Sequence, residues 1–375
     1  MIKRILQEVI TSKFSLKKAI IILGPRQTGK TTLLKQLIDK NSPDVFWLNA
    51  DKIDDRSLFN DDAFNNFLSF VSDKNFLVID EAQRIENIGL KLKIIFDETD
   101  LQIIATGSSS FDLSSRINEP LTGRKLQYNL YPFSFEELAQ KFDTFEEFKN
   151  LNTRLIYGAY PDVVLQPGHQ KELLENLASS YLYKDVLEWD LVKNANKLLK
   201  LLQALAFQIG NQVSYNELGK IIKTSSTTVE NYIDLLEKSF VVFTLPSFSR
   251  NQRNELKKSK KIYFYDNGIR NALINNFNTI NLRNDIGALW ENYIISERLK
   301  YTKYHQIYAN RYFWRTRTKQ EIDYIEERDG KLFAYEFKWN KHKKAKIPRA
   351  FMEAYPDVET KIITPDNYID FITKM

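Results

Sequence analysis

A glycine-containing segment near the N-terminus constrains this chain more than any other stretch of its sequence. Residues 24–32 read GPRQTGKTT, which fits the spacing Gly-x4-Gly-Lys-[Ser/Thr] at every fixed position. The fixed positions are Gly24, Gly29, Lys30 and Thr31. The apolar run AIIIL precedes the segment, and the amphipathic run TLLKQLI overlaps its last residue and follows it. The sequence therefore predicts a strand, a phosphate-binding loop and a helix N-terminus; the alternative is an ordinary strand–helix turn.

Each position of this loop has a role in holding a nucleotide phosphate. Backbone N–H groups at a helix N-terminus bind phosphate oxygens, and glycine lets the backbone approach them closely. We expect Lys30 to place its charge on the β and γ oxygens, and the hydroxyl of Thr31 to bind Mg²⁺. The rest of the predicted nucleotide-binding segment consists of Pro25, Arg26, Gln27, Thr28 and Thr32.

A second segment supplies the acids that such a site needs. Residues 76–83 read FLVIDEAQ, an apolar run that ends in Asp80 and Glu81. At a strand end beside a phosphate loop, Asp80 can hold Mg²⁺ through water, and Glu81 can orient and polarise the attacking water. The alternative is that these acids cap the next helix, but the preceding phosphate loop favours the catalytic interpretation.

A third apolar run carries small polar residues to the same region. Residues 101–106 read LQIIAT and continue into GSSS. The carboxyl ends of parallel strands meet at one edge of a sheet, where ligands bind, so we expect Thr106 or Ser108 to sense the γ-phosphate. A plain Gly/Ser turn is the alternative.

Hydrophobic patterning divides the 375 residues into three zones, and an α/β fold is expected. Residues 1–150 alternate short β-branched runs with helical segments, which predicts a parallel sheet with flanking helices. Residues 151–248 have a helical period, residues 262–375 mix strands with helices, and a polar linker or long loop at 249–261 separates them. The chain has no Cys and only 3 His, so metals, where they bind, must bind carboxylates.

Taken together, the motifs resemble a known family. GPRQTGKTT, VIDEAQ, ATGSSS, LTGRK, LYPFSFEEL and YGAYPDV occur in the order found in bacterial and archaeal AAA-type ATPases that carry a C-terminal domain of uncharacterised function. The resemblance covers essentially the whole chain and is most specific in residues 20–165. It implies ATP as the nucleotide, an AAA-like ATPase core, a winged-helix-like region, and a last domain similar to the PD-(D/E)xK nuclease fold.

The same resemblance singles out an arginine. Arg124 in LTGRK matches the Gly-Arg element of the family and is the candidate cation that completes the γ-phosphate site, within the chain or across a subunit boundary. Arg84 and Arg116 are weaker candidates. The alternative for Arg124 is a surface salt bridge.

The middle zone carries a second recognisable order of elements. Residues 214–246 predict two capped helices joined by a short turn and followed by a strand, which is the order of a winged helix. In a DNA reader the second helix presents polar or basic residues to the phosphates, yet this one carries Glu230, Asp234 and Glu237. We therefore favour a scaffold over direct DNA reading by this helix.

The third zone contains a predicted hairpin with a charged face. Asp329-Gly330 lies between two alternating runs, which is a strong signal for a two-residue loop. The resulting register sets Asp323 opposite Glu336. It also sets Glu321 opposite Lys338, so that one face of the hairpin gathers all four charged side chains.

This charged face has two interpretations. Carboxylates directly opposite each other repel unless a cation or a proton lies between them, so Asp323 and Glu336 are candidate Mg²⁺ ligands. Lys338 fits the nuclease pattern as the lysine that positions or activates water, and Glu291 resembles the additional acid of such nucleases. The alternative is a solvated face with a Glu321–Lys338 ion pair.

The net charge of +6 is compatible with a polyanionic partner, and it leaves two partner hypotheses open. In the first, an ATPase regulates a DNA-facing C-terminal domain, with or without nuclease activity. In the second, ATP drives an interaction switch that docks a protein partner. The N-terminus lacks the apolar core of a signal peptide, and no apolar run is long enough for a membrane span, so we expect a cytoplasmic protein without a membrane partner. The oligomeric state stays open.

Overall fold

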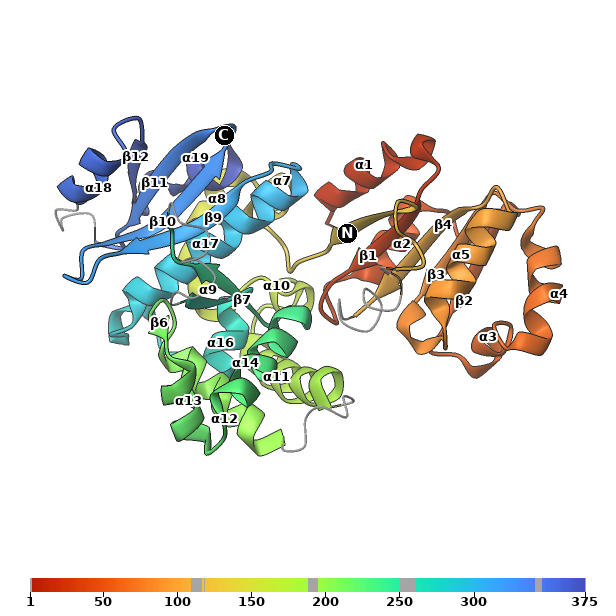
Figure 1. The fold of residues 1–375 in the computed structure, drawn as a ribbon, viewed down its shortest axis with the longest axis horizontal. Coiled ribbons are helices and arrows are strands. Elements are labelled where there is room, and N and C mark those ends of the chain that lie inside the picture. Colours follow the sequence, from red (N-terminus) through yellow and green to blue (C-terminus); the bar gives the residue numbers. More distant parts are fainter. Residues whose placement is uncertain are drawn as a thin grey trace. The chain divides into compact units, whose positions relative to one another are not determined.

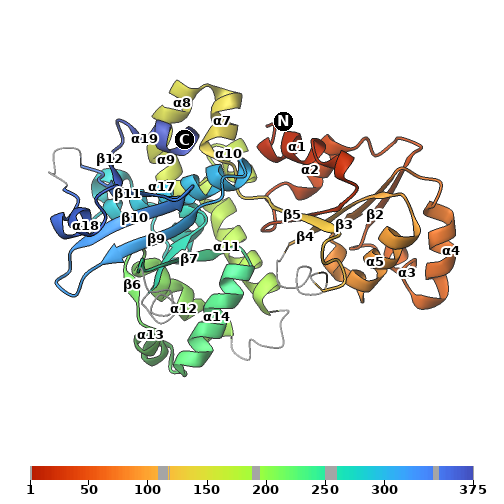
Figure 2. The same cartoon turned by 45° about the horizontal axis from the view of Figure 1, so that its top comes forward.

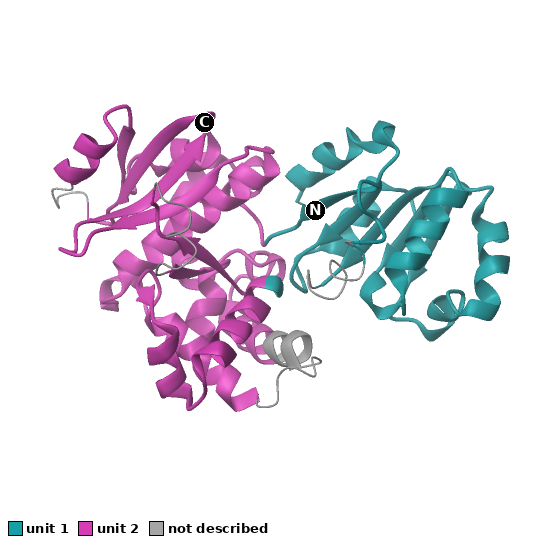
Figure 3. Ribbon diagram, viewed as in Figure 1, with its two compact units in different colours: residues 1–131, 238–240 teal, residues 132–237, 241–375 magenta. Residues whose placement is uncertain are grey.

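The computed structural model describes residues 2–108, 117, 119–187, 195–249, 260–340 and 346–374, with the backbone alone for 180–187. The chain divides into two compact units (Figure 3). Unit 1 contains residues 1–131 and 238–240, and unit 2 contains residues 132–237 and 241–375. Residues 132–150, which we assigned to the first domain from the sequence, therefore cluster with unit 2.

Unit 1 is built on a parallel five-stranded sheet of order β2-β3-β4-β1-β5, as the alternating pattern predicted (Figure 1). Its strands are β1 (Ala19–Leu23), β2 (Val45–Asn49), β3 (Phe76–Asp80), β4 (Gln102–Gly107) and β5 (Lys125–Asn129). Its helices are α1 (Ile5–Thr11), α2 (Lys30–Leu37), α3 (Ile53–Ser57), α4 (Asp61–Val71) and α5 (Ile88–Glu98). Short 3-10 turns form at η1 (Phe14–Leu16) and η2 (Ala82–Arg84).

The unbroken apolar runs of this unit become the inner strands. All five residues of β1 are buried, because β1 lies between β4 and β5 and both of its faces are covered. At the edge strand β2, Phe46 packs its ring against Phe67 and Phe70 of α4, with centroids 5.7 and 5.5 Å apart. Figures 1 and 2 both place α3 and α4 beside this edge.

The first half of unit 2 is mainly helical, as the pattern predicted. Its helices are α7 (Phe135–Phe142), α8 (Thr144–Lys149), α9 (Leu151–Tyr157), α10 (Pro161–Leu165), α11 (Gln170–Leu187), α12 (Ala195–Phe207), α13 (Tyr215–Ile222) and α14 (Ser226–Lys238). A small sheet of order β6-β8-β7 joins β6 (Gln212–Val213), β7 (Val242–Pro246) and β8 (Lys260–Phe264). The predicted succession of helix, turn, helix and strand is thus present as α13, α14 and β7.

A close backbone approach explains the glycine of the YGAYPDV segment. Asp266 caps α16 (Asn267–Leu273) through the N–H of Ile269, and its other oxygen accepts from the N–H of Ala159 at 2.7 Å. A Cβ atom on Gly158 would lie 2.0 Å from this carboxylate, and the φ of Gly158 is 68°. The segment therefore joins two distant parts of the chain inside unit 2.

The second half of unit 2 is a four-stranded sheet of order β12-β11-β10-β9. Its strands are β9 (Asn310–Arg315), β10 (Glu321–Arg328), β11 (Lys331–Phe337) and β12 (Glu359–Ile363), and its helices are α17 (Ile286–Tyr304), α18 (Arg349–Ala354) and α19 (Tyr368–Thr373), with a 3-10 turn η4 (Ile280–Leu282) before them. Phe371 of α19 packs on the rings of Tyr324, Tyr335 and Phe337. The opposite core contains Ile322, Ile325 and Ala334 with Phe351 of α18.

The β10–β11 hairpin has the predicted loop and register. Asp329 and Gly330 have φ of 51° and 74°, and Tyr324 lies opposite Tyr335. The pairing of β10 with β9 is irregular between Ile322 and Ile325. Beyond the last backbone pair, Oδ2 of Asp323 accepts a hydrogen bond from the N–H of Phe337 at 2.9 Å. The side chain of Asp323 thus continues the contact between the two strands.

Within the described ranges, no helix is both long enough and apolar enough to cross a lipid bilayer.

Candidate functional site

The predicted phosphate loop lies at the carboxyl edge of the unit 1 sheet, between β1 and α2. Gly29 is the N-cap of α2 with φ of 89°, and Gln27 also has a positive φ, 59°. A Cβ atom on Gly24 would lie 2.2 Å from the carbonyl oxygen of Leu130, so this position has no room for a side chain. Glycine is therefore needed at both ends of the loop, for a close approach at one end and for a left-handed backbone at the other.

Lys30 extends its side chain along the inside of the loop. Its side chain is only 4% exposed, and Nζ donates to the carbonyl oxygens of Gly24 and Pro25, each at 3.0 Å. The same Nζ lies 4.0 Å from Oε1 of Glu81. A buried ammonium held by two carbonyls is a point charge in the position where a phosphate loop places it.

A chain of hydrogen bonds connects the three strand ends that the sequence singled out. The hydroxyl of Thr31 donates to Oδ2 of Asp80 at 2.7 Å, and the hydroxyl of Thr106 donates to Oδ1 of Asp80 at 2.5 Å. Thr106 Oγ1 in turn accepts from the backbone N–H of Glu81 at 3.1 Å. The structure therefore brings together the predicted magnesium ligands, Thr31 and Asp80, with the predicted sensor residue.

Glu81 lies next to these hydrogen-bonded residues, because its N–H donates to Thr106. Its backbone is left-handed, with φ of 55°, and its side chain makes no capping hydrogen bond to the turn that follows. Its Oε2 accepts from Nε2 of Gln83 at 2.6 Å, and the same Nε2 lies 3.1 Å from the hydroxyl of Ser108. The interpretation of Glu81 as a helix cap is therefore wrong. Sequence reasoning missed Gln83, although its position two residues after the acid was visible.

Of the three arginine candidates, Arg124 lies away from this site. Arg124 immediately precedes β5, and its carbonyl accepts from the N–H of Ala19 at the start of β1, which is the amino edge of the sheet. There its Nε pairs with Oδ1 of Asp97 at 2.8 Å. The expectation that Arg124 completes the site of its own chain is thus wrong, because parallel strands separate it from the carboxyl edge.

Arg84 lies in η2 with its Nε 3.6 Å from Oδ1 of Asp51, and Arg116 lies outside the described residues.

A second cluster of charges lies on the hairpin face in unit 2. Lys338 Nζ is 2.6 Å from Oε1 of Glu336 and 3.8 Å from Oδ2 of Asp323. Glu321, expected to pair with Lys338, instead contacts Lys261 Nζ at 2.5 Å and Arg315 at 3.3 Å, because the irregular pairing at this end of β10 turns it toward β8 and β9.

Glu291 on α17 joins this cluster through residues that sequence reasoning missed. Its Oε1 accepts from Lys261 Nζ at 3.1 Å and from the hydroxyl of Tyr263 at 2.5 Å. Both partners come from β8 and alternate along the strand, so the period of two in KIYFYD was the signal that could have found them.

The electrostatics of the cluster follow from its burial. Burial, together with the charges of Glu291 and Glu336, raises the pKa of Asp323 to about 8. Burial also raises the pKa of Glu336, although Lys338 opposes the shift. Among the residues that the structure describes, no three His, Cys, Asp or Glu side chains are gathered closely enough to hold a metal ion. Within the cluster, Lys261 contacts Glu291 and Glu321, and Lys338 contacts Glu336 and Asp323.

The helix pair of the middle region presents acids outward, as the sequence indicated. Thr227, Glu230, Asn231 and Asp234 are exposed on α14, while Glu237 accepts from the N–H of Thr244 at 2.6 Å. The basic residues Lys341, Lys343 and Lys344, which follow the hairpin in the sequence, lie outside the described residues.

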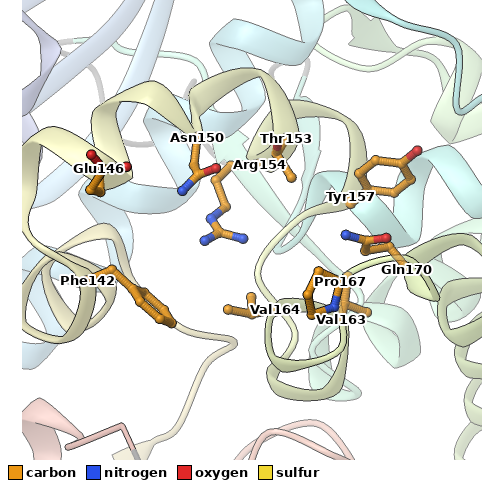
Figure 4. A pocket seen from close by; sticks show the side chains of 10 residues that line it. All are labelled: Phe142, Glu146, Asn150, Thr153, Arg154, Tyr157, Val163, Val164, Pro167 and Gln170. Carbon is orange, nitrogen blue, oxygen red and sulfur yellow. The ribbon is translucent and has the colours of Figure 1, made fainter.

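A separate cavity of about 420 Å³ in unit 2 lies between α7, α8, α9 and α10 (Figure 4). The guanidinium of Arg154 faces it, but Nε and Nη2 are held by both oxygens of Glu147 at 2.6 and 2.9 Å. Its charge is therefore already neutralised within the protein.

Comparison with family models matches three successive parts of the chain. Residues 16–139 match a family model described as an AAA domain. Residues 148–280 and 286–369 match two models described as domains of unknown function. The match beyond residue 280 therefore names no nuclease.

Relatives span most of the chain at low identity. An uncharacterized protein of Methanocaldococcus jannaschii is 26% identical and covers 96% of this chain and 85% of its own length. An uncharacterized protein of Haemophilus influenzae is 26% identical, and the match covers 68% of this chain and 68% of that protein.

Among solved structures, the Pif1 helicase of Candida albicans has a TM-score of 0.28 at 17% identity over 48% of both chains. The RuvB branch migration motor of Thermotoga maritima has a TM-score of 0.28 at 16% identity over 67% of this chain and 94% of its own. These TM-scores are too low to carry an argument about this chain.

Proposed function

We propose that unit 1 binds and hydrolyses ATP with Mg²⁺. The observation that carries the proposal is the hydrogen-bonded chain Thr31–Asp80–Thr106 beside the buried Lys30 and the carboxylate of Glu81. The match of residues 16–139 to an AAA domain supports it independently.

The residues of the site divide the work between binding and chemistry. Lys30 exchanges the carbonyls of Gly24 and Pro25 for phosphate oxygens, and the backbone N–H groups of the loop hold the remaining phosphate charge. The hydroxyl of Thr31 and the carboxylate of Asp80 are oxygen donors of the kind that Mg²⁺ prefers, and bound there it would neutralise charge between the β- and γ-phosphates. Glu81 takes the proton of the attacking water while Gln83 fixes its carboxylate.

Nucleotide binding tests the first half of this proposal. Calorimetric titration of ATP and ADP should show binding to the parent and a severe loss in Lys30→Ala, because the phosphates lose a point charge inside a buried loop. Lys35→Ala is the matched control, since Lys35 is an exposed lysine on the same helix. Equal affinities in the parent and Lys30→Ala would reject the site.

We keep Arg124 as a candidate only across a subunit boundary, where it would serve the site of a second copy. Arg124→Ala should then lower turnover more than it weakens ADP binding, since the proposed partner is charge on the γ-phosphoryl group. Asp97→Ala, which removes the partner of Arg124 in its own chain, is the control. Equal turnover in the parent and Arg124→Ala would make the residue structural.

A second candidate function belongs to unit 2, which we propose as a DNA-facing domain with a metal-dependent nuclease site. Its two metal-binding carboxylates would be Asp323 and Glu336, with Lys338 beside them, whereas Glu291, the third candidate acid, is held by Lys261 and Tyr263. The specific observation is Oε2 of Glu336, which is buried without a hydrogen-bond partner in the described structure. Carboxylate oxygens suit Mg²⁺ or Mn²⁺, so an orphaned buried oxygen beside a second carboxylate fits such an ion. Lys338 would position the attacking water. The alternative proposal is a docking domain without this activity, in which the winged-helix-like order of α13, α14 and β7 is a scaffold.

Thermal melting across a Mn²⁺ titration, without nucleotide, separates these alternatives. A metal that binds the folded state raises the melting temperature of the parent and has no such effect on Glu336→Gln. Glu353→Gln is the control, because Glu353 is an exposed acid of the same unit. Identical responses of the parent and Glu336→Gln would remove the nuclease candidate and leave the docking domain.

A further inference from the structure

The N-terminal segment of unit 1 is bonded directly to the phosphate loop. Arg4 is only 3% exposed and precedes α1 as its N-cap residue. Its Nη1 donates to the carbonyl oxygen of Thr28 at 2.7 Å, and its Nη2 donates to the carbonyl oxygen of Tyr131 at 2.6 Å. One guanidinium therefore joins the loop to the segment that follows β5.

The bond to Thr28 sets the orientation of a peptide inside the loop. The C=O and N–H of a trans peptide point in opposite directions, and the described backbone contains no cis peptide. A Thr28 carbonyl held by Arg4 turns the N–H of Gly29 away from the guanidinium. Gly29 is the N-cap of α2, where backbone N–H groups bind phosphate oxygens.

Through its second hydrogen bond, Arg4 connects Thr28 in the loop to Tyr131, whose preceding residue lies against the first residue of the loop, Gly24. The N–H of Leu130 donates to the carbonyl of Leu23 at 2.7 Å, and the carbonyl of Leu130 lies against Gly24. Residues 130–131 thus contact the loop at its first residue, and Arg4 connects them to Thr28 near its last. Tyr131 is also the last residue of unit 1 before the chain enters unit 2.

We propose that Arg4 is a positioning residue for the nucleotide, which fixes the N–H of Gly29 toward the phosphates and couples the occupied loop to Tyr131. The inference rests on the proposed binding of ATP by unit 1. The guanidinium of Arg4 holds the two carbonyls with two different nitrogens, Nη1 and Nη2, in a fixed planar fork, whereas a lysine carries its donors on one nitrogen. Because ATP and ADP both place phosphate at the loop, the effect falls on the affinity for both and not on the chemical step.

Calorimetry of Arg4→Lys and Arg4→Gln, with Gln7→Ala as the matched control, tests the proposal. Gln7 docks the same segment on α2 through the carbonyl of Gln36 at 3.0 Å without touching the loop. We expect both Arg4 variants to bind ADP and ATP at least about tenfold more weakly, as for the loss of a hydrogen bond from a charged donor, with kcat at saturating ATP unchanged. Gln7→Ala should bind like the parent.

Parent-like ADP affinity in the Arg4 variants, or an equal loss in Gln7→Ala, overturns the proposal. The parent alone provides a second test should the Arg4 variants fail to fold. Saturating ADP is expected to slow amide hydrogen exchange in residues 24–32 and also at Leu130 and Tyr131, and protection confined to 24–32 contradicts the coupling. If the parent binds ADP no better than Lys30→Ala does, the proposed function of unit 1 is itself wrong.

Discussion

The carboxylate of Glu81 is oriented by its neighbours before any nucleotide is considered. A positive φ is uncommon for a residue with a side chain, and here the backbone N–H bonds Thr106 while the side chain bonds Gln83. The conformation places a charged oxygen 4.0 Å from the ammonium of Lys30. A group oriented in this way is suited to accept a proton from water near the γ-phosphate.

Glu81→Gln should retain nucleotide binding and lose hydrolysis. An amide cannot take the proton of the attacking water, so kcat should fall by at least about 100-fold, the lower range for loss of a general base. Glu86→Gln is the control, since Glu86 is an exposed acid five residues away. Parent-like turnover in Glu81→Gln, measured by phosphate release, means that another group activates the water.

Asp323 should make the stability of unit 2 fall as the pH rises. Its pKa is about 8 in the folded protein, raised by burial and by Glu291 and Glu336, whereas Lys261 and Lys338 oppose the shift. The native state therefore binds more protons than the unfolded state between about pH 4 and pH 8, and the free energy of unfolding decreases across that window.

Asp323→Asn should remove this dependence. The variant should melt above the parent at pH 8, by about 2–4 °C for each kcal/mol recovered, and close to the parent at pH 4. Asp357→Asn changes an exposed aspartate of the same unit and serves as the control. Melting curves measured without metal that give parallel pH profiles for the parent and Asp323→Asn contradict the assignment.

Single residues differ in how far the sequence reveals them. Lys30, Thr31 and Asp80 were predicted because the chemistry of phosphate binding fixes their spacing and type. Arg4 could not be predicted, since its partners are backbone carbonyls that any residue supplies. Lys261 is an intermediate case, for its alternation with Tyr263 marks a shared strand face but not the acids that face it.

At the scale of elements, one buried ion pair joins α17 to β10. Arg298 holds both oxygens of Glu326 at 2.7 and 2.8 Å, and both side chains are at most 1% exposed. The same guanidinium donates to the carbonyls of Phe371 and Lys374 at the C-terminal helix. The guanidinium of Arg298 therefore connects three elements of unit 2: α17, β10 and α19.

Arg298→Met should destabilise the protein by about 3–5 kcal/mol, because Glu326 would stay buried without its closest cation and would keep only Arg328, at 3.6 Å, and the hydroxyl of Tyr324. Arg349→Met, which breaks an exposed pair with Glu353, should cost less than about 0.5 kcal/mol. Urea denaturation of the full chain measures both. Similar small losses in the two variants would show that the carboxylate of Glu326 reaches water or another partner.

The elements themselves were largely predictable, and their lateral order was not. Apolar runs marked β1, β2, β3 and β4 of unit 1 but not β5, whose sequence KLQYN is mostly polar, and Asp329-Gly330 marked the hairpin. The parallel pairing of β5 with β1, which sets Arg124 at the amino edge, depends on long-range packing that no local pattern records. The irregularity between Ile322 and Ile325, which redirects Glu321 to Lys261, is likewise set by the neighbouring strands.

At the scale of the whole molecule, the proposed DNA-facing domain should communicate with the ATPase. ATP turnover should rise when single- or double-stranded DNA is added, and the stimulation should fall as salt increases from about 50 to 200 mM, because phosphate contacts release counterions. The negatively charged polymer polyglutamate is a control for charge alone. Turnover that is indifferent to DNA at low salt would favour the docking of a protein partner.

We propose that unit 1 hydrolyses Mg²⁺·ATP at the carboxyl ends of β1, β3 and β4. Release of phosphate from ATP in the presence of Mg²⁺, measured side by side for the parent, Lys30→Ala and Lys35→Ala, tests it most directly. We expect turnover by the parent and by Lys35→Ala, and a fall in Lys30→Ala to the phosphate release measured without protein. Equal phosphate release by the parent and Lys30→Ala, or none by the parent, would contradict it.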